Sequence, residues 1–123
     1  MSYIATKLAY GTYTPTLTNI ANLDASTAYS SQYLRVGNEV TVSGRFDIDP
    51  TSTLTATTMD ISLPVASTFT SVGQCAGTAQ SPAIAAQSMA ILANTASATA
   101  QLQYKAADVT NQATYFTFTY RVL

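Results

Sequence analysis

The stretch QYLRVGNEVTVSGRFDIDP, Gln32 to Pro50, predicts two β-strands joined by a tight turn at Gly37-Asn38. Apolar and polar residues alternate on both sides of the turn. This is the pattern of strands with one buried face, because successive side chains point to opposite faces of a sheet. Pro50 ends the second strand, since it has no backbone N–H to donate.

The register of this hairpin should keep its apolar rows on one face. A two-residue loop would separate Leu34 and Val36 from the apolar residues of the second strand. A three-residue loop, Gly37 to Glu39, would pair Val36 with Val40 and keep the rows together. We therefore expect the three-residue loop, or a bulge at that point.

The same alternation recurs along the rest of the chain. It predicts strands at Thr12 to Thr18, Thr57 to Pro64, Val72 to Gln80, Ser88 to Ala93, Thr99 to Ala106 and Thr114 to Leu123. Asn19 to Ser26, rich in Asn, Asp and Ser, predicts a loop. Pro82 to Gln87 stays open, because Pro82 fits a first helical turn while the flanking segments favour strands.

About eight short strands, with turn signals every ~8–12 residues, predict an all-β fold. We expect a jelly-roll-like β-sandwich of antiparallel strands, with an immunoglobulin-like sandwich as the alternative. At 123 residues the chain is one domain. Residues 1–11 lack a clean period and predict an extended N-terminal arm, and residues 12–123 form the single β-sandwich domain.

Charge is the informative part of the composition. Only 9% of the residues are charged and the net charge is −1, whereas ~25% is ordinary for soluble domains. Thr and Ser together number 33 and must supply much of the polar surface. This balance does not attract nucleic acid, and no run of about 18 apolar residues predicts a membrane span. We infer that much of the surface is covered in an assembly.

The sequence offers no catalytic or cofactor-binding pattern. It contains no histidine, so a Ser-His-Asp triad and an imidazole metal site are excluded. Cys75 is expected to be a small buried residue, because no histidine can activate it. Asp47 and Asp49, with Asp60 nearby, are expected to form a solvated strand end rather than a calcium site. We expect no enzyme, no metal and no cofactor.

Eight tyrosines are available for the core or for an interface. Alternation places Tyr104 and Tyr120 in the core and points Tyr33 and Tyr115 outward. Tyrosine is favoured in interfaces because it combines a large apolar area with a polar tip. With residues of the arm added, the candidate partner contacts are Tyr3, Ile4, Leu8, Tyr10, Tyr33 and Tyr115.

Several stretches together resemble a known family of domains. YTPTLTN (Tyr13 to Asn19), the hairpin stretch and ISLPVAS (Ile61 to Ser67) are similar to a small β domain of tailed-phage and prophage virion proteins. ANT (Ala93 to Thr95) and the terminal FTYRVL (Phe118 to Leu123) resemble the closing segment of that domain. The resemblance extends over nearly the whole chain from Tyr13 onward.

The resemblance implies a trimeric structural or attachment module of a virion, with no catalytic motif. In that family the domain usually lies at the C-terminal end of longer tail or fibre proteins, whereas here only a dozen residues precede it. We therefore expect a capsid decoration (cement) protein that binds the major capsid protein as a homotrimer, in virions assembled in the host cytoplasm. The alternatives are a fibre or receptor-binding tip that recognises host glycans, and another tail structural subunit.

Overall fold

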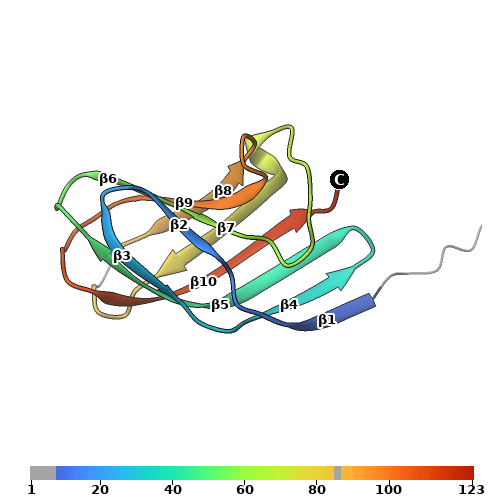
Figure 1. Ribbon diagram of the computed structural model, residues 1–123, viewed down its shortest axis with the longest axis horizontal. Helices are drawn as coiled ribbons and strands as arrows, with labels where there is room; N and C mark the ends of the chain where they lie inside the picture. Colours follow the sequence, from blue (N-terminus) through green and yellow to red (C-terminus); the bar gives the residue numbers. More distant parts are fainter. Residues whose placement is uncertain (1–7, 85–86) are drawn as a thin grey trace, which may run out of the picture.

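The computed structural model describes residues 8–84 and 87–123, which form an all-β protein with its antiparallel strands in one curled sheet (Figure 1). The strands are β1 (Leu8–Tyr13), β2 (Leu17–Ala21), β3 (Leu23–Ala28), β4 (Ser31–Val36), β5 (Glu39–Pro50), β6 (Ala56–Ile61), β7 (Cys75–Gln80), β8 (Met89–Asn94), β9 (Thr99–Lys105) and β10 (Gln112–Arg121). A short 3-10 helix, η1 (Val72–Gln74), precedes β7. Within these two described ranges, no helix has the length and apolar character needed to cross a membrane.

The strand order is β1-β4-β5-β10-β7-β8-β9-β6-β2, and β3 pairs with β5. β2 pairs with β6 at one margin of the sheet, and β3 returns to β5 after a single intervening residue, Asn22. Asn22 has a left-handed backbone with φ of 59°. Asparagine tolerates this conformation better than most residues, so the chain changes partner strands within one residue and the sheet curls.

One Greek key is visible in this topology. β7, β8 and β9 follow one another and pair in that order, and β10 then returns to lie beside β7. The resulting spatial order, β10-β7-β8-β9, is that of a Greek key. The prediction of an all-β antiparallel protein is therefore confirmed.

Some local predictions differ from the structure. The predicted loop from Asn19 to Ser26 is wrong, because Asn22 alone makes the break and strands run on both sides of it. Leu8 to Gly11 of the predicted arm lie in β1, which pairs with β4, and residues 1–7 lie outside the described residues. The predicted strand at Ser88 to Ala93 is confirmed as β8. In the open segment, residues 82–84 form a turn and residues 85–86 lie outside the described residues.

The predicted register of the β4–β5 hairpin is also wrong. The loop has two residues, Gly37 and Asn38, and Val36 lies opposite Glu39. Gly37 takes a φ of 63°, which glycine adopts at little cost in a tight turn. In this register Leu34 lies on the face opposite to Val40, and the side chains of Leu34 and Val36 are 46% and 49% exposed.

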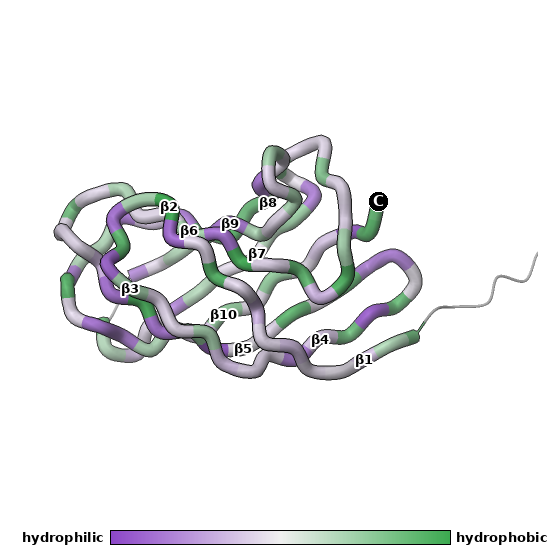
Figure 2. Tube along the Cα trace, in the orientation of Figure 1, coloured by the Kyte–Doolittle hydropathy of each residue, from purple (hydrophilic) through white to green (hydrophobic). Residues whose placement is uncertain are grey.

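The core lies inside the curl and is rich in aromatic residues. Phe46 of β5 stacks on Phe116 of β10 with ring centroids 5.1 Å apart, and Phe116 stacks on Phe118 at 5.9 Å. The predicted core positions of Tyr104 and Tyr120 are confirmed, since both side chains are buried. Figure 2 shows hydrophobic and hydrophilic residues interleaved along the strands, as expected when one face of each strand packs inward.

Gly77 of β7 lies against the backbone of β10. A Cβ at this position would meet the carbonyl oxygen of Thr117 and the Cα of Phe118, and these backbone atoms cannot move aside. We expect Gly77→Ala to lower the free energy of unfolding by about 2 kcal/mol, measured by urea unfolding. Gly73→Ala is the matched control, because an added Cβ there meets no atom of the described residues within 4 Å. Equal losses in the two variants would contradict this assignment.

The buried tyrosines predict a loss of stability in alkali. Burial raises the pKa of Tyr104 and of Tyr120 from 10.0 to about 12, and it raises the pKa of Tyr13 as well. The unfolded chain loses these protons at a lower pH than the folded chain. Their contribution is therefore complete below pH 10 and is lost as the pH rises from 10 towards 12.

We expect the thermal midpoint of unfolding, measured by circular dichroism, to fall as the pH rises through this window. An absorbance titration of tyrosinate in the folded protein should show a late-titrating group of tyrosines. Simultaneous titration of all eight tyrosines, with no loss of stability, would contradict the prediction.

Candidate functional site on the outer face of the sheet

The candidate surface is the side of the sheet that faces away from the core. The register across β1, β4, β5 and β10 brings alternate residues of these strands onto one side. This surface, called the outer face below, comprises Leu8, Tyr10, Thr12, Gln32, Leu34, Val36, Glu39, Thr41, Ser43, Arg45, Tyr115, Thr117, Thr119 and Arg121. Most of its polar residues are uncharged, and Glu39 lies opposite Arg121 at one end.

Four apolar residues gather at the β1 margin of the outer face. Leu8 lies opposite Val36, and Tyr10 lies opposite Leu34. Their exposed fractions are 67% for Leu8, 81% for Tyr10, 46% for Leu34 and 49% for Val36. This group is called the apolar edge below. Contiguous exposed apolar surface of this kind marks interaction sites more often than scattered single residues do.

The strand that carries half of the apolar edge also has an unpaired side. β1 stands at one end of the strand order and pairs only with β4 within the described residues. Its sequence, LAYGTY, contains no charged residue and no proline, which are the usual means of protecting an edge strand from association. The unpaired side of β1 can therefore accept a further strand beside the apolar edge.

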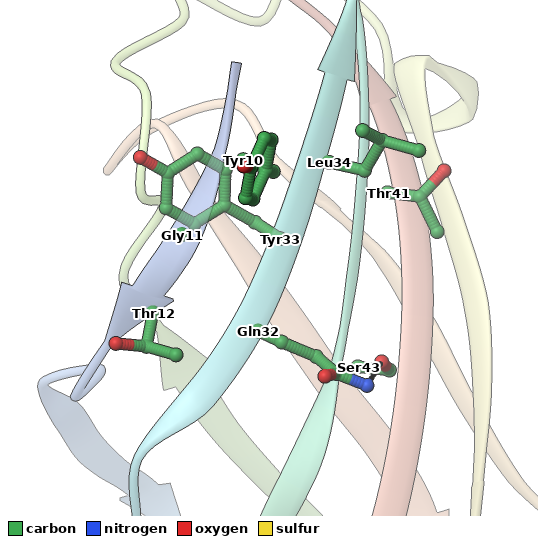
Figure 3. Close-up of a pocket in the computed structure, with 8 residues that line it drawn as sticks. All are labelled: Tyr10, Gly11, Thr12, Gln32, Tyr33, Leu34, Thr41 and Ser43. Atoms are coloured by element: carbon green, nitrogen blue, oxygen red, sulfur yellow. Dashed lines mark hydrogen bonds between the residues drawn. The ribbon is translucent and has the colours of Figure 1, made fainter.

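An open groove of about 620 Å³ lies on the outer face next to the apolar edge. Its lining, drawn in Figure 3, is Tyr10, Gly11, Thr12, Gln32, Tyr33, Leu34, Thr41 and Ser43. Tyr10 and Tyr33 lie towards one end of the view and Gln32 and Ser43 towards the other. The amide nitrogen of Gln32 donates a hydrogen bond of 3.2 Å to Ser43 Oγ.

A second depression, of about 500 Å³, continues this groove across β5 towards β10. It shares Thr12, Gln32 and Ser43 with the first and reaches Arg45 and Tyr115. The combined surface offers hydroxyl and carboxamide groups between two exposed tyrosines, of which Tyr115 is 52% exposed. Such a lining can bind neutral polar groups or the surface of another protein.

Arg45 is held by an aromatic ring and a carboxylate. Its guanidinium lies 4.5 Å from the centroid of the Tyr29 ring, and its Nη2 lies 3.0 Å from Asp47 Oδ1. The hydroxyl of Tyr29 donates a 2.9 Å hydrogen bond to Asp47 Oδ2. Hydrogen bonding to Asp47 is the main cause of the raised pKa of both Tyr29 and Arg45. The three side chains fix one another at the β10 side of the groove.

The predicted contact residues fall in different places. Leu8 and Tyr10 lie on the apolar edge and Tyr115 lies on the outer face, while Tyr3 and Ile4 lie outside the described residues. The prediction that Tyr33 points outward is wrong. Its ring packs against the core, edge-to-face with Tyr13 at 6.2 Å, because the two-residue turn places Tyr33 on the face of Val42.

Leu34 and Val36 of the apolar edge were not predicted as contacts. The sequence signal that could have found them is the Gly37-Asn38 pair, which fits a two-residue hairpin loop. Such a loop sends both side chains to the outer face. Alternation favours the three-residue loop instead, because that loop would keep the apolar residues of both strands on one face.

The carboxylates do not form the cluster considered from the sequence. Asp47 pairs with Arg45, and Asp60 lies on β6, which is paired with β2 and β9. Within the described residues, no group of three or more His, Cys, Asp or Glu side chains could hold a metal ion. Cys75 is buried, and burial raises the pKa of its thiol to about 12, so it stays protonated and unreactive near neutral pH.

Asp60 is instead a buried structural carboxylate, only 6% exposed. Asn94 Nδ2 donates to both of its oxygens at 3.1 Å. Ser97 Oγ donates at 3.1 Å and Gln101 Nε2 at 3.0 Å. These neutral donors connect β6 to the end of β8, the following turn and β9. Both oxygens of Asp60 thus accept hydrogen bonds that hold these strands together.

Comparison with known proteins adds no relative to this description. No family model matches the chain, and no match was found among the curated proteins or among the solved structures.

Proposed function

We propose that this chain is a virion structural protein of a tailed phage, a capsid decoration or cement protein that binds the outer shell as a homotrimer. The observation that carries the proposal is the apolar edge, exposed beside the unpaired side of β1. The partners of the protein are further copies of the chain and the major capsid protein. The protein acts in the virion, which is assembled in the host cytoplasm. Contacts made only with the assembled shell stabilise that shell by mass action.

The character of the outer face supports a permanent interface. Leu8, Tyr10, Leu34 and Val36 expose apolar area that gains free energy when it is buried. The Thr and Ser residues beside them can be covered without the desolvation cost of charges. The number of copies, three, rests on the resemblance to the phage virion domain.

The location of the chain on the particle tests this proposal. A reconstruction of the virion by electron cryomicroscopy should contain repeated trimeric density on the faces of the shell. The curled sheet should fit this density with its apolar edge in contact with another copy of the chain or with the major capsid protein. Density confined to the tail would contradict decoration of the capsid and would favour a tail or baseplate subunit.

The groove favours a second candidate function, recognition of host surface glycans by a fibre or receptor-binding tip. Sugars stack on exposed aromatic rings and bond to neutral polar groups. The groove has Tyr10 beside Gln32, Thr41 and Ser43, and the second depression adds Tyr115. A glycan array tests this candidate. Saturable binding to one glycan class that is lost in both Tyr10→Ala and Tyr115→Ala would favour it over decoration. An array without binding would remove it.

We also propose that the curled sheet is a jelly-roll-like sandwich. The Greek key made by β7 to β10 supports this, because Greek keys occur in most β-sandwiches. A jelly roll contains two such keys. Among the remaining strands, β2 pairs with β6 and the following strand β3 pairs with β5, so the chain passes from β6 to β5 at this point. An immunoglobulin-like sandwich stays the alternative prediction.

A further inference from the structure

The inward side chains of the curled sheet change from aromatic to polar at one end. Along β10 the inward side chains are Tyr120, Phe118 and Phe116, followed by Thr114 and Gln112. The same alternation that builds the aromatic core thus carries two polar side chains inward. Thr114 lies opposite Phe46 and Gln112 opposite Ile48, so both remain within the sheet.

Further polar side chains reach this end from neighbouring strands. Ser81 follows directly after β7, whose last residue Gln80 lies opposite Tyr115, so it continues the strand beside Thr114. Tyr104 comes from β9, opposite Thr57 of β6. Gln87 precedes β8, and its Nε2 donates a 2.9 Å hydrogen bond to the Lys105 carbonyl oxygen. This group of five residues, called the polar end below, is Ser81, Gln87, Tyr104, Gln112 and Thr114.

Four of these side chains are at least nine-tenths buried. Their exposed fractions are 4% for Ser81, 9% for Tyr104, 3% for Gln112 and 0% for Thr114. Even so, six side-chain atoms of the polar end are buried without a hydrogen-bond partner among the described residues. They are Ser81 Oγ, Gln87 Oε1, Tyr104 Oη, Gln112 Oε1, Gln112 Nε2 and Thr114 Oγ1.

Such a concentration of buried polar atoms, unpartnered among the described residues, requires bonding partners beyond those residues. Buried polar atoms in folded proteins are nearly always bonded to protein or to ordered water. Burial raises the pKa of Tyr104 to about 12, and the nearby Gln112 side chain partly opposes that rise. The two side chains are therefore close, although no hydrogen bond of ordinary geometry joins them.

We propose that the polar end binds a cluster of ordered water molecules. The atoms to be bonded belong to hydroxyl and carboxamide groups, which are neutral, so no ion is called for. Each buried water typically makes about three hydrogen bonds, so the six atoms correspond to about two waters. These waters join β7, β9 and β10 where apolar packing stops.

Magnetic relaxation dispersion of water ¹⁷O tests this proposal on the whole chain. The wild-type protein should show a dispersion from about two long-lived internal waters. Thr114→Val, nearly the same shape without the hydroxyl, should lose part of that signal and unfold at a lower temperature. Thr117→Val is the matched control on the outer face of the same strand, and it should leave the dispersion unchanged.

Three results would overturn the proposal. A wild-type protein without dispersion would show that no long-lived water is present, whatever the variants do. A higher unfolding temperature for Thr114→Val would show that the Thr114 hydroxyl of the wild-type protein is buried without a bound water. Removal of an unbonded buried polar group stabilises the folded state. A small solute that stays bound in native mass spectrometry would replace water as the occupant.

Discussion

Replacing Leu34 with lysine is expected to turn the proposed homotrimer into monomers while the domain stays folded. Leu34 is central in the apolar edge, opposite Tyr10 on one side and Thr41 on the other. At an interface between copies, each lysine would bring a charge into an apolar contact and repel its equivalents. Like charges brought together at an interface cost several kcal/mol. We expect association at least about 100-fold weaker, because each 1.4 kcal/mol is tenfold.

The folded state should tolerate this change. Leu34 is already 46% exposed, and a lysine can lay its aliphatic stem along the neighbouring side chains with its ammonium group in water. We expect a change in the free energy of unfolding within about 0.5 kcal/mol for the isolated domain. Size-exclusion chromatography with light scattering measures the mass, and circular dichroism checks the fold.

Val109→Lys is the matched control, because Val109 is 45% exposed but lies in the loop before β10, away from the outer face. It should leave the trimer intact. Dissociation by both variants would point to a general effect of charge. A Leu34→Lys protein that stays trimeric would exclude the apolar edge as the interface between copies.

Replacing Asp60 with alanine is expected to cost about 3 kcal/mol of the free energy of unfolding. Asp60 is 6% exposed and accepts hydrogen bonds from Asn94, Ser97 and Gln101. Bonds to a charged group contribute about 1.5–3 kcal/mol, and a buried donor left without its acceptor costs about 1–3 kcal/mol. Asp60→Asn should lose less, because the amide keeps one acceptor oxygen in place. Urea unfolding near neutral pH measures both variants.

Asp24→Ala provides the control for Asp60. Asp24 is exposed and accepts one hydrogen bond, of 2.9 Å, from Thr51 Oγ1. Its removal should change the free energy of unfolding by no more than about 0.5 kcal/mol. A loss at Asp60 no greater than the loss at Asp24 would show that the buried carboxylate does not hold β6, β8 and β9 together.

Strand identity could be predicted from the sequence because alternation is a local property. In β10, Phe116, Phe118 and Tyr120 are inward and Tyr115, Thr117 and Thr119 are outward, as their order in the chain predicts. The hairpin register could not be predicted in this way. Turn geometry decides register, and the preference of the Gly37 backbone for a two-residue turn outweighs the exposure of Leu34 and Val36.

The candidate site depends on relations that a single sequence does not contain. The apolar edge forms because β1 pairs with β4, which joins residues more than twenty positions apart. Asp60 meets Asn94, Ser97 and Gln101 across 34 to 41 positions, so its burial could not be read from its neighbours in the chain. The low charge predicts that much of the surface is covered in an assembly, which stays a prediction, but it could not say which strands would carry that surface.

Sedimentation equilibrium of the wild-type chain, over a wide range of concentrations, tests most directly whether the chain associates into the proposed trimer. The account predicts one species with three times the mass of the chain. A monomer at every concentration, with Leu8, Tyr10, Leu34 and Val36 left in solvent, would contradict it.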